Sequence, residues 1–198
     1  MLSGILSFHA SSMPMSGTSR QPILARQTIV TAMSKQARRG SGRKPDITLQ
    51  FATRKPDVPR AADIRAWATA ALRDKPGAQL TVRIVAEPEG TQLNEQWRGK
   101  QGPTNVLSFP CDGRDEIVPE LLGDIVICAP VVAREAREQG KDLQAHWAHM
   151  LIHGTLHLLG YDHQQTADAE RMEKLETDIL HEFGYPDPYT PIEPAATD

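Results

Sequence analysis

Three histidines within eleven residues constrain this chain more than any other feature. His153, His157 and His163 follow the spacing H-x3-H-x2-G-x2-H. Residues four apart lie on the same face of a helix, so His153 and His157 can both turn a ring nitrogen toward one ion. A third ligand six residues later requires the helix to end first, and Gly160 stands where a left-handed turn would end it. The spacing therefore predicts a metal site built around the end of a helix.

The expected metal is one zinc ion per chain, because three imidazole ligands suit zinc. Three protein ligands leave a fourth position for water, which is typical of catalytic rather than structural zinc sites. Zinc peptidases with the pattern HExxHxxGxxH carry a glutamate directly after the first histidine as general base. Gly154 occupies that position here. Either another residue supplies the base, or a water activated by the metal suffices.

Two further residues are candidates for supporting the metal ligands without binding the metal themselves. His149 forms a competing i, i+4 pair with His153, but no third ligand follows it after a turn. We therefore expect His149 to support the ligands or to line the cleft. Asp162 is adjacent to His163 and can orient a ligand through a hydrogen bond, although capping a turn is an equally good interpretation.

Composition limits the classes of function that are open to the chain. Its 198 residues suit one domain. No segment approaches the roughly 20 apolar residues that span a membrane. Cys111 and Cys128 show no C-x-x-C pattern, which predicts reduced thiols in a cytoplasmic protein. Positive charge is concentrated in residues 1–45 and negative charge in residues 162–198, so a nucleic acid would have to be held by a local cluster.

Composition also suggests three regions. Residues 1–45 are basic and lack apolar periodicity, which predicts a disordered tail or a start placed too far upstream; an organellar transit peptide is a third alternative. Residues 46–185 are expected to form a single domain. Residues 186–198 are rich in proline and are expected to be a loose tail.

Hydrophobic periodicity predicts four strands and five helices in the central region. The strands are expected near residues 47–51, 80–84, 106–109 and 125–127, and the helices near 59–72, 91–97, 130–139, 143–159 and 166–183. The run at 125–127 is apolar enough for a central strand, and the last helix should bury Met172, Leu175, Ile179 and Phe183. This order predicts an α+β fold, in which helices cover a mixed four-stranded sheet and the zinc-binding helix packs on that sheet.

A second polar cluster lies between the second predicted helix and the third predicted strand. It contains Arg98, Lys100, Asn105 and Ser108 around a Gly-Pro turn. The planar guanidinium of arginine suits phosphate oxygens, which makes this segment a candidate for binding RNA. A surface loop whose polar side chains cap turns is the alternative.

Three segments of this chain resemble the YbeY family of bacterial endoribonucleases, the rRNA maturation factors. They are LNEQWRGKQGPTNVLSFP, LLGDIVICAP and HMLIHGTLHLLGYDH, in this order, within residues 46–185. The resemblance implies that His153, His157 and His163 bind zinc and that Arg98 is the catalytic arginine. Many relatives have an aspartate where this chain has Gln101, which puts a role for that carboxylate in doubt.

The resemblance also implies an activity and its partners. The expected function is metal-dependent cleavage of single-stranded RNA, in 3′-end maturation of small-subunit ribosomal RNA and in ribosome quality control. Its partners would be ribosomal RNA, the small ribosomal subunit and associated assembly proteins. Zinc would polarise a phosphate oxygen while Arg98 neutralises the developing charge; the attacking group is either water or the 2′-hydroxyl. The alternatives are a non-catalytic, zinc-stabilised assembly factor and, less favoured, a peptidase.

Overall fold

The computed structural model describes residues 43–53, 57–111, 120–161 and 165–190. Its elements follow the predicted order of strands and helices. They are β1 (Asp46–Phe51), α2 (Ala61–Ala71), β2 (Gln79–Val85), α3 (Glu87–Arg98), β3 (Val106–Pro110), β4 (Leu121–Cys128), α4 (Ala129–Glu138), α5 (Leu143–Leu158) and α6 (Thr166–Glu182). Most of the segment predicted to be a basic tail, residues 1–42, lies outside the described residues.

The four strands form one mixed sheet in the order β1-β2-β4-β3. β1, β2 and β4 run parallel, and β3 pairs antiparallel with β4. The apolar run at 125–127 lies in β4, between β2 and β3, so the prediction of a central strand is confirmed. β3 lies at the edge of the sheet, next to α5.

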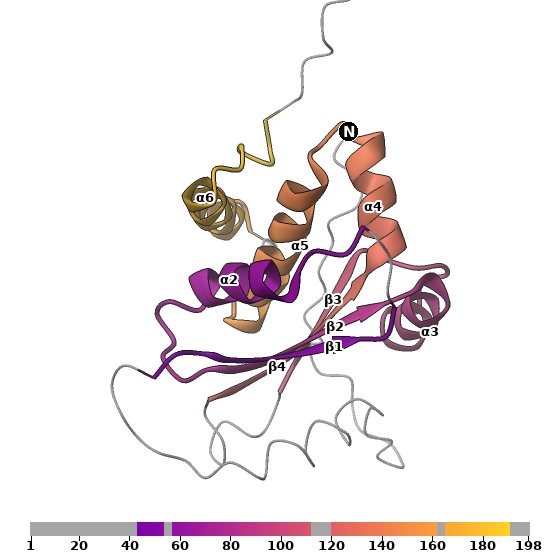
Figure 1. The fold of residues 1–198 in the computed structure, drawn as a ribbon, viewed down its shortest axis with the longest axis horizontal. Helices are drawn as coiled ribbons and strands as arrows, with labels where there is room; N and C mark the ends of the chain where they lie inside the picture. The colour runs from indigo at the N-terminus through magenta and orange to yellow at the C-terminus, as the bar shows by residue number, and fades with distance from the viewer. Residues whose placement is uncertain (1–42, 54–56, 112–119, 162–164, 191–198) are drawn as a thin grey trace, which may run out of the picture.

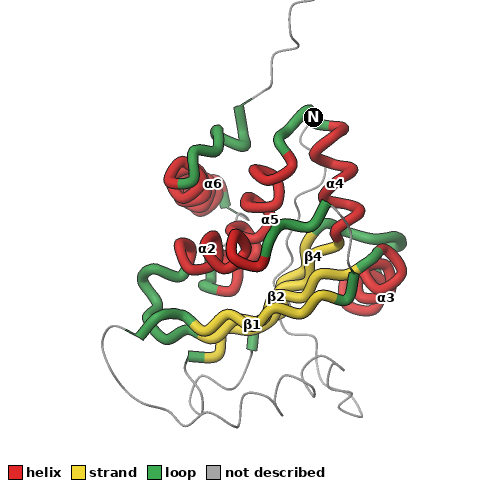
Figure 2. Tube along the Cα trace, viewed as in Figure 1, coloured by secondary structure: helices red, strands yellow, loops and turns green. Residues whose placement is uncertain are grey.

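Helices cover both faces of this sheet, which confirms the predicted α+β fold (Figures 1 and 2). Ile125 and Ile127 of β4 join the larger core, together with residues of α2, α5 and α6. Val126 and Cys128 alternate with them and join a smaller core on the other face, against which Leu93 of α3 packs. α6 packs on α5 rather than on the sheet and so forms an outer layer.

The structure corrects the start of one helix. α3 begins at Glu87, earlier than the predicted start at Thr91. Pro88 stands in the first turn, where its missing N–H is no loss, and Glu87 and Glu89 interact favourably with the helix N-terminus. Apolar periodicity did not reveal this first turn because the turn contains no apolar side chain that packs in the core.

The ends of α5 are fixed by its sequence. The Asp142 side chain accepts a hydrogen bond from the N–H of Ala145 at 2.9 Å and caps the N-terminus. At the other end Gly160 adopts a φ of 88°, and the N–H of Tyr161 reaches back to the carbonyl of Leu156 at 3.1 Å. This is a Schellman motif, which requires a residue in the left-handed conformation. The predicted turn at Gly160 is thereby confirmed.

α5 is the central helix of the fold. Every residue from His146 to His157 is buried, because α2, α4, α6 and the strands β3 and β4 surround the helix. Each polar side chain on such a helix needs a hydrogen-bond partner, either within the helix or from a neighbouring element. Despite this apolar setting, no helix in the described part of the chain is long and apolar enough to cross a membrane.

We expect Cys128 to resist alkylation in the folded protein. Its side chain is buried in the smaller core, and burial raises the pKa of its thiol to about 11. At pH 8 only about one thiol in a thousand is then ionised, and the thiolate is the reactive form. In a Cys111→Ser background, iodoacetamide at pH 8 should label Cys128 only after denaturation. Rapid labelling of the native protein would contradict this packing.

Candidate metal centre

The first histidine of α5 contacts α4. His146 Nε2 lies 2.9 Å from Oε2 of Glu135. The same carboxylate accepts hydrogen bonds from Nδ2 of Asn105 at 3.1 and 3.2 Å. His146 is therefore part of a link between α4, α5 and the start of β3, and not of the predicted metal site.

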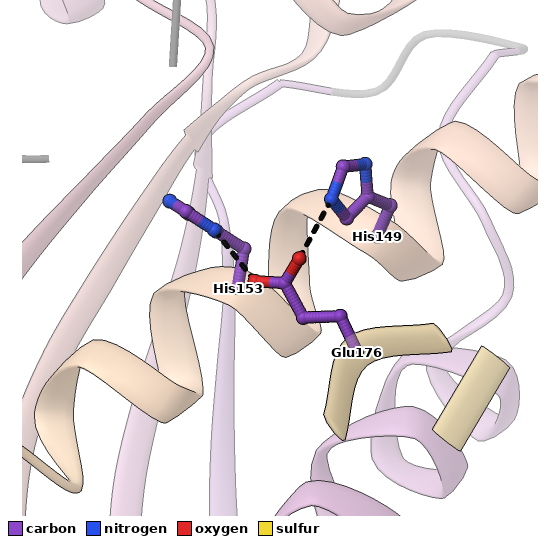
Figure 3. A group of neighbouring side chains, drawn as sticks. All are labelled: His149, His153 and Glu176. Atoms are coloured by element: carbon purple, nitrogen blue, oxygen red, sulfur yellow. Dashed lines mark hydrogen bonds and ion pairs between the residues drawn. The ribbon is translucent and has the colours of Figure 1, made fainter. Parts of the chain in front are cut away.

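The next two histidines converge on one carboxylate of α6 (Figure 3). Nε2 of His149 lies 3.1 Å from Oε2 of Glu176, and Nδ1 of His153 lies 2.7 Å from Oε1. The Glu176 side chain is completely buried. The Tyr189 hydroxyl also donates to Oε2. His149 and His153 therefore share Glu176 as a hydrogen-bond partner. The supporting role of His149 beside the metal ligands stays a prediction.

Glu176 is a buried carboxylate that remains ionised. Burial alone would raise its pKa, but hydrogen bonds from His149 and His153 outweigh burial and hold the pKa well below its usual range. An ionised carboxylate only accepts hydrogen bonds, so Nδ1 of His153 and Nε2 of His149 carry the protons. Burial lowers the pKa of His149, which is consistent with a neutral ring. The hydrogen bond to Glu176 accordingly uses Nδ1 of His153 and not Nε2.

His153 and His157 face each other across one turn of the helix. Their Nε2 atoms are 3.1 Å apart, and their ring planes are nearly perpendicular. Two nitrogens bound to the same tetrahedral zinc at about 2.0–2.1 Å lie about 3.3 Å apart. The spacing of this pair thus fits a shared ion with only a small adjustment. Nε2 of His153 also points away from Glu176 (Figure 3).

A second arrangement of ligands deserves comparison. The ligand atoms of His149, His153 and Glu176 all lie within 4.8 Å of one another, close enough to hold a metal ion. However, Nε2 of His149 and Nδ1 of His153 donate to the ionised Glu176 in this group, so an ion bound there would have to displace both protons. We therefore favour the Nε2 atoms of His153 and His157 as the metal-binding pair, because metal-binding histidines usually donate their other N–H to a carboxylate and His153 donates to Glu176.

Two residues of the predicted site cannot be placed. His163 and Asp162 lie outside the described residues. The chain reaches them directly after the Schellman turn at Gly160, so the turn required by the spacing is present.

Gly154 lies on the face of α5 that packs against β3 and β4. A Cβ at this position would be 3.1 Å from Oγ of Ser108 and 3.2 Å from Cγ2 of Val106. Such distances are tighter than ordinary van der Waals contact, so a longer side chain has no room. The position of the peptidase glutamate therefore points into the sheet, and not toward the metal pair.

We expect Gly154→Glu to destabilise the fold by more than about 3 kcal/mol, because it adds overpacking and an unpaired buried charge. Urea denaturation followed by circular dichroism measures this loss. Gln144→Glu, in the first turn of the same helix, is the matched control and should change stability little, because a carboxylate is favourable there. Equal stabilities of the two variants would contradict the close packing of Gly154 against Ser108 and Val106.

Arg98 is the last residue of α3. Among the described residues its Nε and Nη2 atoms are buried without a hydrogen-bond partner. Burial lowers its pKa, but a guanidinium stays charged at neutral pH. A desolvated cation with unsatisfied donors is suited to bind an anion from outside the chain. Trp97 packs edge-on against Phe109 of β3 and holds this end of α3 at the edge of the sheet.

The loop after Arg98 is organised by a buried asparagine. Nδ2 of Asn94 donates to the carbonyls of Lys100 and Gly102 at 3.1 and 2.8 Å. Gly99 ends the helix in the left-handed conformation with a φ of 64°. The loop is thus folded back onto its own helix, which fixes the position of Arg98.

The three residues predicted with Arg98 to contact substrate differ in their surroundings. Lys100 is exposed. Asn105 is buried, and its Oδ1 accepts the N–H of Val106 at 2.7 Å while its Nδ2 contacts Glu135. Ser108 donates to the carbonyl of Gly154 at 3.1 Å. Asn105 and Ser108 therefore hold β3 against α4 and α5, whereas Lys100 is open to solvent.

Sequence analysis missed Glu176, Glu135 and Asn94. It expected α6 to bury Leu175 and Phe183, but these are only partly buried, and Glu176 and Leu180 take the inner positions instead. One signal was available, since Glu176 falls at helical spacing from Met172 and Ile179, on the apolar face of α6. A carboxylate on such a face indicates a partner across the helix interface.

Part of this chain is similar to known endoribonucleases. A family model described as "Endoribonuclease YbeY" matches residues 50–184. The chain is 58% identical over 139 residues to an endoribonuclease YbeY of Stutzerimonas stutzeri, covering 69% of this chain and 87% of that protein. It is 53% identical over 152 residues to one of Nitrosococcus oceani, covering 74% and 97%. A solution structure from Thermotoga maritima aligns with a TM-score of 0.48 and 25% identity, covering 74% of this chain and 99% of that one.

Proposed function

Because this chain belongs to the YbeY family of endoribonucleases, we propose that it is a zinc-dependent enzyme that cleaves single-stranded RNA. His153, His157 and His163 are its proposed zinc ligands, and Arg98 is its proposed catalytic residue. The observation that carries the proposal is that the Nε2 atoms of His153 and His157 face each other. His153 also donates a hydrogen bond to the buried, ionised carboxylate of Glu176.

The residues of the chain have separate tasks in the proposed reaction. Zinc held by these histidines would supply a Lewis acid at the scissile phosphodiester. Glu176 holds the proton on Nδ1 of His153, so that Nε2 is available as a ligand. Arg98 donates to the phosphate oxygens and neutralises the negative charge that builds up as the phosphorus is attacked. Asn94 keeps the loop after Arg98 folded, which positions the guanidinium.

We propose ribosomal RNA as the substrate, at the 3′ end of the small-subunit RNA, with a further role in ribosome quality control. The names of the relatives support an RNA substrate. The central residues carry nearly balanced charge, so the chain alone offers little general affinity for RNA. The small ribosomal subunit and its assembly proteins would then supply specificity, and the reaction would take place in the cytoplasm.

The two alternatives fit less well. A peptidase needs a general base beside the metal, and the position of that base is occupied by Gly154, which is packed against Val106 and Ser108. A non-catalytic assembly factor is less favoured because the relatives of this chain are named endoribonucleases. The two unsatisfied donor atoms of Arg98 among the described residues suit a phosphate in either RNA cleavage or RNA binding, so the cleavage assay separates these two functions.

We expect His157→Ala to lose both zinc and RNA cleavage, because one of the two facing ligands is removed. The measurement is cleavage of an end-labelled single-stranded RNA, with zinc content determined on the same preparations. His181→Ala is the matched control, since His181 is exposed on α6. The control should retain about one zinc per chain and full activity.

The outcomes of this experiment separate the hypotheses. Wild-type protein that holds zinc but leaves RNA intact would favour the assembly factor, and cleavage of casein would favour the peptidase. If RNA is cut, a 2′,3′-cyclic phosphate on the product would identify the 2′-hydroxyl as the attacking group. A single 2′-deoxy substitution at the cleavage site would then abolish the reaction, whereas attack by water would survive it.

We expect Arg98→Ala to reduce the rate of cleavage about 100- to 1,000-fold without loss of zinc, because a donor to the developing charge is removed. Arg98→Lys should recover only part of the rate, since an ammonium cannot make the paired hydrogen bonds of a guanidinium. Arg65→Ala, on the exposed face of α2, is the control. An Arg98→Ala protein that keeps wild-type activity and wild-type zinc content would show that Arg98 has no part in the mechanism.

A further inference from the structure

The segment after α6 docks onto the folded domain. Sequence composition assigned residues 186–198 to a loose tail, and residues 186–190 of that segment are described. Nζ of Lys141 donates to the carbonyl of Pro188 at 2.9 Å. The Asp187 side chain accepts the N–H of Tyr189 at 2.9 Å and the hydroxyl of Thr177 at 3.4 Å. These contacts join the segment to α6 and to the loop before α5.

Docking places Tyr189 against the histidine and glutamate group. Its hydroxyl donates to Oε2 of Glu176. Its ring contacts the ring of His149 edge to face, with 5.5 Å between centroids. Tyr189 lies beyond residues 50–184, the part of the chain that the family model matches.

The two oxygens of Glu176 consequently have different partners. Oε2 accepts from the Tyr189 hydroxyl and from Nε2 of His149, whereas Oε1 accepts from Nδ1 of His153. The terminal torsion of a glutamate is soft, so the plane of its carboxylate is set by its hydrogen bonds. Two donors on Oε2 fix that plane and aim Oε1 at His153.

The hydrogen bond to His153 in turn decides how its ring is presented. The bond holds the proton on Nδ1 and sets the rotation of the ring, which leaves Nε2 opposite Nε2 of His157. A change in the orientation of the Glu176 carboxylate would therefore also change the orientation of His153, a proposed metal ligand.

We propose that Tyr189 is a positioning residue of the metal centre, which acts through Glu176 to orient His153 toward the ion. This inference rests on the proposed function, because it assumes that the Nε2 atoms of His153 and His157 bind the metal. Tyr189 does not touch the metal or the RNA in this arrangement. Residues 186–190 thereby support the proposed metal centre without entering it.

The test compares two tyrosines of the same segment in the full-length chain. Tyr189→Phe removes only the hydroxyl that contacts Glu176. Tyr185→Phe is the matched control, because the Tyr185 ring packs on Trp67 and Phe183 instead. The zinc dissociation constant is measured by competition with a chromogenic chelator, and the visible absorption of the Co²⁺-substituted protein reports ligand geometry.

We expect Tyr189→Phe to weaken zinc binding about tenfold and to shift the Co²⁺ absorption. Mutation of residues that hydrogen-bond a metal ligand typically lowers metal affinity about 10- to 100-fold, and Tyr189 acts one residue further from the ion. Tyr185→Phe should match wild type in both measurements. Thermal denaturation of the metal-free proteins shows whether either change acts through stability alone.

Three results would overturn the inference. Wild-type zinc affinity and an unchanged Co²⁺ spectrum in Tyr189→Phe would show that the hydroxyl has no positioning role. An equal loss of zinc affinity in the two variants would show that the loss comes from general packing and not from the Tyr189 hydroxyl. A wild-type chain without zinc affinity would overturn the proposed metal centre itself, and with it this inference.

Discussion

The buried carboxylate of Glu176 is the interaction on which the candidate site depends. A charge without solvent contact is tolerated only when donors surround it, and Glu176 has donors from His149, His153 and Tyr189. Those donors come from α5 and from the C-terminal segment, while the carboxylate comes from α6. One ionised group therefore joins three parts of the chain. It also determines which nitrogen of His153 faces His157.

Much of the fold was predictable because its signals are local. Periodicity within each element gave the order of strands and helices, and Gly160 was recognised because a left-handed residue must follow the helix end. The early start of α3 was missed, since its first turn is polar and is stabilised by Pro88 and two acids rather than by packing. Capping signals are weaker in a sequence than apolar periodicity.

The candidate site was predictable in part, for a physical reason. His153 and His157 lie one turn apart, so their proximity follows from helix geometry alone. Glu176 is 23 residues from His153 and 27 from His149, and only tertiary packing brings them together. α5 is also buried on every side, so it has no polar face to indicate which histidines meet which neighbour. His146 and His149 look alike in the sequence, yet they contact α4 and α6 respectively.

The hydrogen bonds of His149 and His153 to Glu176 affect how far the fold depends on a bound ion. In small zinc domains, ion binding and folding are a single event, because the ligands have no other means of assembly. Here hydrogen bonds to Glu176 already order His149 and His153, and a core of apolar side chains surrounds them. Gain or loss of an ion can then change occupancy without unfolding the chain. Removal of an ion bound by His153 would then leave the contacts between α5 and α6 intact.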